Sequence, residues 1–269
     1  MLAAPSRVRQ HINSRVIPVS SILKSFAVAV VLAFAALPAA AVAGKVNNVV
    51  LVHGAFADGS GWNAVAGLLT EKGYKVSIVQ EPETSLEDDV QATQRVLDQQ
   101  DGPVVLVGHS YGGQIITVAG SDPKVKSLVY VAALVPDIGD SLLSLVKTMP
   151  LPNEDIKSTK DGYLYLDPAR FAIDFAADLP KQTAAFMASS QVFVSEKAFS
   201  APASKAAWHD KPSFAIVATQ DKALNPDLER WMYKRVGVDV TEIAASHAVY
   251  MSKPQAVVDV IEKAAQAVR

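Results

Sequence analysis

Cysteine is absent from the 269 residues of this sequence. A thiol nucleophile, a Cys-ligated zinc site, a disulfide and a lipid-modified cysteine are therefore all excluded. The sequence also lacks an excess of positive charge, because 25 Lys and Arg stand against 27 Asp and Glu, for a formal net charge of −2. Nucleic-acid binding, which needs a basic patch, is not expected. With 50% apolar residues, the chain can bury a sizeable core without covalent cross-links.

Acidic residues are missing from the first 43 residues, whose formal charges come from three arginines and one lysine. An uncharged run rich in Ala, Val, Leu and Phe follows over residues 25–44 and contains Ala41-Val42-Ala43 near its end. A basic start, an apolar run and a small-x-small site are typical of a secretory signal peptide, which we predict for residues 1–43. The alternative is an uncleaved membrane anchor, since about 20 apolar residues can span a bilayer.

Cleavage after this segment would leave residues 44–269 as one globular domain. The loss of four positive charges leaves 21 Lys and Arg against 27 Asp and Glu, a formal charge of −6. We expect this mature chain to be periplasmic or secreted, with no nucleic-acid partner and no membrane contact.

Strand-like and helix-like stretches alternate from residue 45 onward. Residues 104–107 are apolar at every position, which suits the centre of a parallel sheet covered by helices on both faces. The other expected strands cover residues 48–52, 76–79, 125–131, 214–218 and 238–243. Six mostly parallel strands separated by helices predict a doubly wound α/β sheet with right-handed crossovers.

One long segment, residues 136–211, interrupts this alternation before the last two strands. Its apolar residues recur at helical rather than strand spacing. A structureless loop of that length is uncommon in a compact domain. We therefore predict a mostly helical cap over the carboxyl ends of the strands, where α/β sheets bind ligands.

Gly108-His109-Ser110-Tyr111-Gly112 matches the pattern G-x-S-x-G between an apolar strand and an expected helix. A nucleophile elbow presents its serine at such a strand-to-helix turn, and the tight turn leaves no room for side chains at the two glycines. The alternative is a Gly-rich nucleotide-binding turn, but the stretch lacks the G-x-G-x-x-G spacing and the P-loop lysine. We predict that Ser110 is a nucleophile.

A serine hydroxyl needs a base to accept its proton, and four histidines follow the signal segment. His109 adjoins the serine and is expected to point away from its hydroxyl. His53 follows the first strand, where it is expected to hold a loop, and His209 lies in a polar stretch typical of the surface. His247 follows the last strand at the carboxyl edge of the sheet and is the predicted base. A surface histidine without function is the alternative for this residue.

The base needs a carboxylate that sets its tautomer and stabilises the imidazolium. Asp221, in the turn after the fifth strand, is the predicted carboxylate. The chain order Ser110, Asp221, His247 is typical of α/β-hydrolases. Asp227 is the alternative, but it falls in the first turn of an expected helix, where the helix dipole explains an acidic residue.

Attack by a serine on a carbonyl group also needs an oxyanion hole to stabilise the charge that forms on the oxygen. Two backbone N–H groups are expected to form it. One is that of Tyr111, which follows the nucleophile. The other comes from the loop after the first strand, where Ala55 is the predicted donor and Phe56 the alternative.

Together these motifs resemble the α/β-hydrolase superfamily. The finer resemblance is to the branch of plant methylesterases and hydroxynitrile lyases and their bacterial esterase relatives. It rests on His53-Gly54-Ala55-Phe56 followed by Gly61-Trp62, on Gly108-His109-Ser110-Tyr111-Gly112-Gly113, and on Ser246-His247 followed by Ser252-Lys253-Pro254. The resemblance covers the chain after the signal segment. It implies a helical cap on a reduced parallel sheet, and hydrolysis of a small-molecule ester without a metal or an organic cofactor.

Two positions depart from the lyases of this branch, which carry a Thr where Gly54 stands and a Lys where Ala248 stands. These departures argue against cyanohydrin cleavage. The same triad also serves cofactor-free perhydrolases and haloperoxidases, and some receptors keep the fold as non-catalytic binders. The predicted function is hydrolysis of small carboxylic esters through a Ser-His-Asp triad and an acyl-enzyme, with these alternatives open.

Overall fold

The structure, a computed structural model, describes residues 46–268. The signal peptide predicted for residues 1–43 lies outside the described residues. Within the described range, each helix is too short or too polar to span a membrane.

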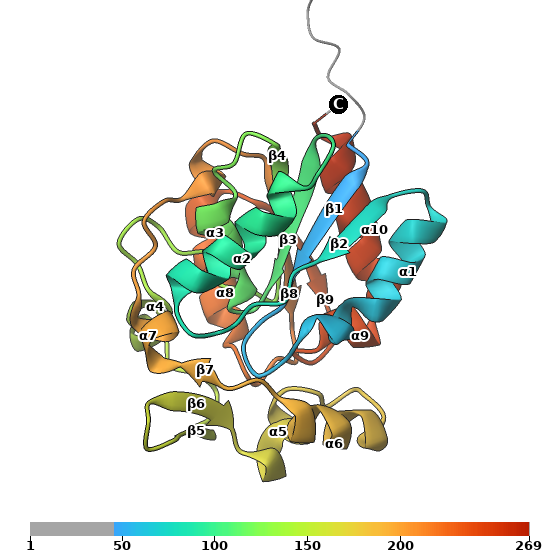
Figure 1. The fold of residues 1–269 in the computed structure, drawn as a ribbon. Coiled ribbons are helices and arrows are strands. Elements are labelled where there is room, and N and C mark those ends of the chain that lie inside the picture. The colour runs from blue at the N-terminus through green and yellow to red at the C-terminus, as the bar shows by residue number, and fades with distance from the viewer. Residues whose placement is uncertain (1–45, 269) are drawn as a thin grey trace, which may run out of the picture. The chain divides into compact units, whose positions relative to one another are not determined.

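A parallel sheet of six strands lies at the centre of the fold, in the order β2-β1-β3-β4-β8-β9 (Figure 1). The strands are β1 (Asn48–Val52), β2 (Lys75–Ile78), β3 (Val104–His109), β4 (Val125–Val131), β8 (Ser213–Ala218) and β9 (Asp239–Ile243). The doubly wound parallel sheet predicted from the sequence is therefore confirmed. From β1 the chain continues to β2 on one side of the sheet, and from β3 it continues to β4 on the other side. The loops after β1 and β3 therefore lead in opposite directions, and the crevice between them is suited to a ligand.

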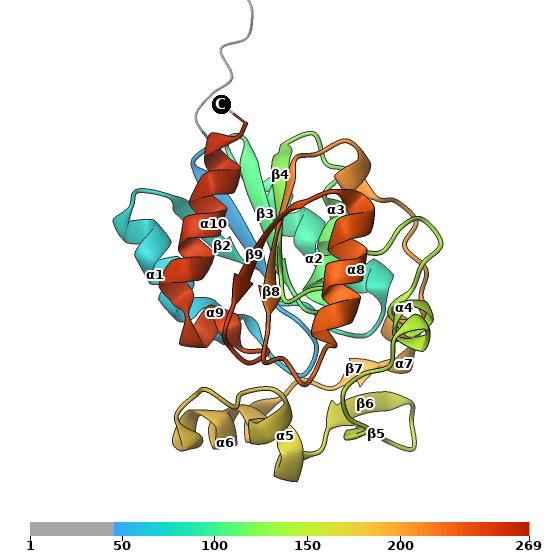
Figure 2. The same cartoon turned by 180° about the vertical axis from the view of Figure 1, so that it is seen from behind.

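Two hydrophobic cores cover the two faces of this sheet. One contains Val50 and Val52 of β1 and packs against α2 (Leu86–Asp98), α3 (Gly112–Ala119) and α8 (Pro226–Val236). The other contains Val49 and Leu51 and packs against α1 (Asn63–Glu71) and α10 (Pro254–Gln266), as Figure 2 shows from behind. Since successive strand side chains point to opposite faces, a strand between two cores must present apolar side chains to both, as residues 49–52 of β1 and 104–107 of β3 do.

Helix ends near the carboxyl edge follow local signals in the sequence. The Ser85 side chain accepts a hydrogen bond from the Asp88 N–H at the start of α2. Asn225 caps α8 in the same way, Pro226 occupies its first turn, and Gly237 ends it with a left-handed φ of 67°. These signals fix where α2 and α8 begin and where α8 ends before β9.

The segment between β4 and β8 contains an inserted cap, whose β5–β7 sheet and helices α5 and α6 lie beyond the carboxyl ends of the strands (Figures 1 and 2). Its helices are α4 (Leu142–Thr148), α5 (Pro168–Asp174), α6 (Lys181–Ser190) and α7 (Glu196–Ser200), whereas the 3-10 turn η2 (Ala207–His209) contacts α3 in the body of the fold, just before β8. It also contains a small antiparallel sheet of β5 (Ile156–Ser158), β6 (Tyr163–Leu166) and β7 (Val194–Ser195). The sequence did not predict these strands, because two to four residues are too few to establish an alternating pattern.

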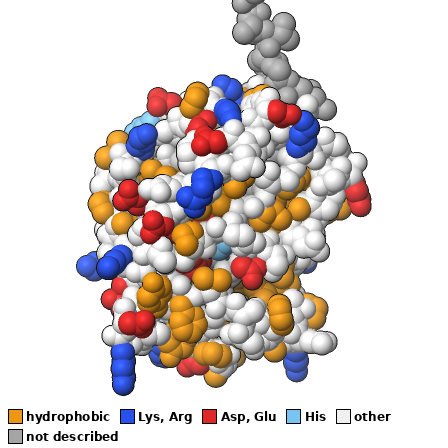
Figure 3. All heavy atoms as spheres, in the orientation of Figure 1, with side chains coloured by type: hydrophobic (Ala, Val, Ile, Leu, Met, Phe, Trp, Pro, Cys, Tyr) orange, Lys and Arg blue, Asp and Glu red, His pale blue; other side chains and the backbone are white. Residues whose placement is uncertain are grey.

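The cap also exposes several large apolar side chains, including Ile173, Phe186 and Phe193. Figure 3 shows hydrophobic side chains gathered over its end of the molecule, whereas charged side chains are scattered over the face shown. Two short elements complete the carboxyl edge beneath the cap, namely η1 (Gly59–Trp62) after β1 and α9 (Val249–Ser252) after β9.

Candidate active site

Ser110 stands at the sharp turn between β3 and α3. Its φ of 52° is left-handed, which is uncommon for a residue with a side chain. The turn is crowded, because a Cβ on Gly108 would lie 2.5 Å from the carbonyl oxygen of Gly112. A Cβ on Gly112 would in turn collide with the carbonyl oxygen of His53. The two glycines are therefore required on steric grounds, and the strained backbone presents Ser110 at the carboxyl edge of the sheet.

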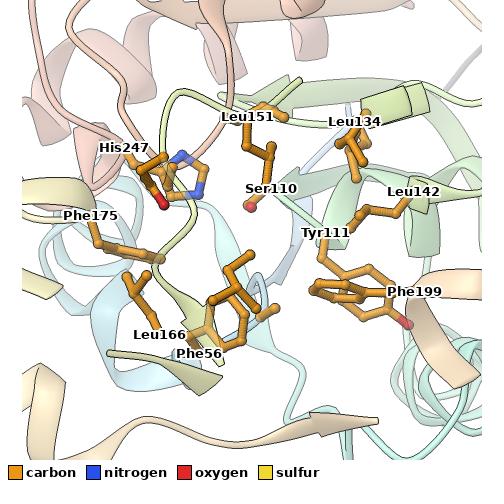
Figure 4. A pocket seen from close by; sticks show the side chains of 16 residues that line it. Phe56, Ser110, Tyr111, Leu134, Leu142, Leu151, Leu166, Phe175, Phe199 and His247 are labelled. Atoms are coloured by element: carbon orange, nitrogen blue, oxygen red, sulfur yellow. The ribbon is translucent and has the colours of Figure 1, made fainter. Parts of the chain in front are cut away.

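His247 and Asp221 meet beside this turn. His247 Nδ1 donates a hydrogen bond to Asp221 Oδ2 at 2.5 Å, and both side chains are buried. The other carboxylate oxygen of Asp221 accepts the N–H groups of Ala223 and Leu224 at 2.7 and 2.8 Å. Figure 4 shows the imidazole of His247 and the hydroxyl of Ser110 facing the same space. The structure thus brings together the three side chains that the sequence singled out.

The alternatives weighed from the sequence lie elsewhere. Asp227 has a side chain that is 74% exposed and pairs with Arg230 on the surface of α8. His209 is also half-exposed and pairs with Asp137 at 2.9 Å. Neither contacts the group around Ser110.

His109 lies behind the site, fully buried. Its Nε2–H donates to the backbone carbonyl of His247 at 3.0 Å, and its ring lies against those of Tyr250 and His247. Burial lowers the pKa of His109 well below its usual value, so the ring is neutral at physiological pH. Sequence reasoning gave this residue no role, but the structure shows that it supports the backbone of His247.

The cap fastens the loop that carries His247. Asp178, between α5 and α6, accepts hydrogen bonds from the Ser246 N–H at 3.1 Å and from the Ser246 hydroxyl. The Ala248 N–H donates to the Phe175 carbonyl at 3.0 Å. These contacts join residues about 70 positions apart, and no local pattern in the sequence indicates them.

Glu229 of α8 is a buried carboxyl beside Asp221. Burial, and then the neighbouring carboxylate of Asp221, raise the pKa of Glu229 well above its usual value. The folded state therefore keeps a proton that the unfolded chain releases as the pH rises past about 4.5. Folding then costs progressively more as the pH increases.

A Glu229→Gln variant lacks this titration and is expected to be the more stable protein at alkaline pH. The advantage in melting temperature over the wild type should grow from about pH 5 to about pH 8, with each kcal/mol amounting to about 2–4 °C. Thermal unfolding followed by circular dichroism measures it. If the difference in melting temperature between the variant and the wild type stayed constant or shrank over this range, the raised pKa of Glu229 would be contradicted.

The loop after β1 lies directly against the nucleophile. A Cβ on Gly54 would lie 2.6 Å from the Cβ of Ser110, so only glycine allows this approach. Phe56 has a left-handed φ of 63°, and the ring of His53 is buried beneath the loop. The structure thus places both candidate oxyanion residues of this loop, Ala55 and Phe56, at the wall of the cavity that contains Ser110.

The cavity encloses about 540 Å³ including its mouth (Figure 4). Besides Ser110, His247, Ala55, Phe56 and Tyr111, it is lined by Leu134, Leu142, Val146, Leu151, Asn153, Ile156, Leu166, Phe175, Phe199, Ala223 and Leu224. None of these lining residues is Lys, Arg, Asp or Glu. The Asn153 amide is already bonded to the Lys222 carbonyl and to the Asp155 N–H. The cavity therefore suits an uncharged, largely apolar molecule.

Residues 46–268 contain no group of three His, Asp or Glu side chains arranged to hold a metal ion. The chemistry that these residues can support is nucleophilic attack by Ser110, with His247 as the proton acceptor.

Residues 49–260 match the sequence profile of the alpha/beta hydrolase family. The chain therefore belongs to this family. The superfamily resemblance predicted from the motifs is confirmed, and its relatives include plant proteins of the predicted branch and bacterial esterases.

Three curated relatives illustrate this range. A carbendazim-hydrolysing esterase of Nocardioides sp. (strain SG-4G) is 35% identical over 118 residues, which cover 38% of this chain and 49% of that enzyme, about half its length. A pyrethroid hydrolase of Sphingobium wenxiniae is 26% identical over 82% of this chain and 89% of its own. Salicylic acid-binding protein 2 of Nicotiana tabacum is 27% identical over 78% of this chain and 93% of its own.

Solved structures agree with this fold. A pyrethroid hydrolase from Sphingobium faniae JZ-2 superposes with a TM-score of 0.70 at 25% identity, covering 82% of this chain and 98% of its own. Polyneuridine aldehyde esterase superposes with a TM-score of 0.69 at 20% identity, covering 81% of this chain and 99% of its own. The second likeness shows the fold alone.

Proposed function

We propose that the protein is an exported serine hydrolase that cleaves small carboxylic esters through an acyl-enzyme on Ser110. One observation carries the proposal: Ser110 at its strained turn shares an apolar cavity with His247, whose Nδ1 bonds to Asp221 at 2.5 Å. The esterases among its relatives support the same reaction class.

The proposed reaction begins when Ser110 Oγ attacks the ester carbonyl carbon and His247 Nε2 accepts the hydroxyl proton. The backbone N–H groups of Ala55 and Tyr111 stabilise the negative charge on the carbonyl oxygen. The intermediate collapses, and the alcohol leaves with the proton from His247. Water then attacks the acyl carbon, gives a proton to His247, and releases the acid as Ser110 Oγ is protonated again. Asp221 holds the tautomer and stabilises the imidazolium throughout.

Crowding around the nucleophile argues further against the lyase alternative. A Cβ on residue 54 would lie only 2.6 Å from the Cβ of Ser110, so the threonine that lyases carry where Gly54 stands would require this turn to shift. Ala248 is fully buried, so a lysine there would require the side chains packed around it to rearrange. A non-catalytic binder has no need for a nucleophile, a base and an acid held together in this way.

The test of this proposal is hydrolysis of p-nitrophenyl esters by the purified protein. Since no Lys or Arg lines the cavity, a neutral p-nitrophenyl butyrate should exceed p-nitrophenyl hemisuccinate in kcat/KM by about tenfold or more. Perhydrolysis with hydrogen peroxide is measured beside it. Equal rates on the two esters would contradict the apolar site, and perhydrolysis without hydrolysis would favour the alternative chemistry.

Export belongs to the same proposal and is supported by the sequence of residues 1–43 alone. Expression of the full chain in a Gram-negative host should yield periplasmic protein that begins at Gly44. Recovery of the uncleaved chain in the membrane fraction would indicate the anchor instead.

A further inference from the structure

Three buried carboxyl groups lie beneath the oxyanion loop, and the proposed reaction uses none of them. Glu81, Glu83 and Asp89, here called the acid cluster, have exposed fractions of 5%, 0% and 0%. One histidine, His53, lies among them and is equally buried. Because burial of a carboxyl without matching positive charge is costly, such a cluster requires an explanation beyond packing.

Glu81 reaches the oxyanion loop through His53. Glu81 Oε2 lies 2.5 Å from His53 Nε2, and on the other side of the ring Nδ1–H donates to the Gly54 carbonyl at 3.0 Å. The Glu81 N–H also donates to His53 Nε2 at 3.2 Å, so this nitrogen accepts and the ring proton lies on Nδ1. The Gly54 carbonyl and the Ala55 N–H are opposite ends of one planar peptide group. Fixing the carbonyl beneath the loop therefore turns the Ala55 N–H the other way.

Asp89 reaches the second oxyanion donor through Tyr111. The Tyr111 hydroxyl donates to Asp89 Oδ2 at 2.7 Å, and the Glu83 N–H donates to Asp89 Oδ1 at 2.8 Å. Burial raises the pKa of Asp89 to about 6, so the group is ionised above that pH and accepts both bonds strongly. The ring of Tyr111 is thereby tethered at the end opposite to its backbone N–H.

Glu83 lies between the contact of Glu81 with His53 and the contact of Asp89 with Tyr111. Its carboxyl lies 3.6 Å from His53 Nδ1 and faces the backbone N–H of Phe56. Its own backbone has a left-handed φ of 54°, held by the bond to Asp89. Because His53 fixes the peptide group between Gly54 and Ala55, we take Ala55 as the loop donor.

We propose that Glu81 and Asp89 are positioning residues for the oxyanion hole, Glu81 acting through His53 on the Ala55 N–H and Asp89 acting through the Tyr111 hydroxyl. The inference rests on the proposed ester hydrolysis and deepens it. The two N–H groups serve the tetrahedral oxyanion more than the bound ester. Loss of their alignment therefore lowers kcat while KM stays close to its original value.

The test uses Glu81→Leu and Tyr111→Phe in the full chain. The second variant removes one hydroxyl and keeps the backbone donor. Each should lower kcat by about 10- to 100-fold, less than the 100- to 1000-fold cost of losing a whole donor. Affinity for a trifluoromethyl ketone, which forms a tetrahedral oxyanion adduct with the serine, should fall by the same factor. Glu81→Gln should restore most of kcat, because its amide can still donate to His53 Nε2.

Glu87→Gln, on the exposed face of α2, is the matched control and should behave as the wild type. A loss of kcat with unchanged ketone affinity would overturn the proposal and leave the cluster a purely structural role, and so would wild-type kinetics in both variants. Tyr111→Phe decides the question if Glu81→Leu does not fold. Wild-type protein without ester turnover would instead refute the proposed function, so the two failures are distinguishable.

Discussion

Replacement of Ser110 by alanine is expected to lower kcat for ester hydrolysis by about five to six orders of magnitude. The hydroxyl is the attacking group in the proposed reaction, and no other serine and no threonine lines the cavity. The fold should be unaffected. Alanine has the same Cβ as serine, so the strain at a φ of 52° does not change. The measurement is turnover of p-nitrophenyl butyrate beside a thermal unfolding curve.

Ser189→Ala is the control for this variant, because Ser189 is exposed on α6 and bonds only within its own helix. It should retain wild-type turnover. Retained activity in Ser110→Ala with an unchanged melting curve would show that another group performs the chemistry.

Asp221→Asn is expected to lower kcat by about 10⁴-fold with little change in the fold. The amide keeps an acceptor for the N–H groups of Ala223 and Leu224. Its NH₂ group, however, faces His247 Nδ1, which must then give up its proton. The ring is left in the wrong tautomer, with Nε2 protonated and unable to accept the proton of Ser110.

Asp227→Asn is the matched control, since it makes the same chemical change on the carboxylate that the sequence left as the alternative. This side chain is exposed and pairs only with Arg230, so kcat should stay within about twofold of the wild type. Loss of activity in Asp227→Asn, with full activity in Asp221→Asn, would reverse the assignment.

The sequence predicted the central sheet because its strands carry their own signals. Residues 104–107 are apolar on both faces, and the helices between strands begin and end at recognisable caps such as Ser85 and Gly237. The small sheet of the cap carried no such signal. Its pairing of Tyr163–Leu166 with the two-residue strand Val194–Ser195 depends on contacts across about 30 positions.

The predicted triad residues could be chosen from the sequence because each follows a strand at the same edge of a parallel sheet. Ser110 has a local motif, and Asp221 and His247 follow from chain order. The residues that position the triad and the oxyanion loop could not be chosen in this way. Asp178 and Glu81 act only through distant partners, and an isolated acidic residue in a sequence is indistinguishable from one on the surface.

Covalent labelling by a fluorophosphonate tests the central proposal most directly, because the reagent reacts with an activated serine and needs no knowledge of the natural ester. We expect one phosphonyl group per chain, located on Ser110 by peptide mass spectrometry, with ester turnover falling in proportion to labelling. Labelling at another residue, or full turnover by the labelled protein, would contradict the assignment of Ser110 as the nucleophile.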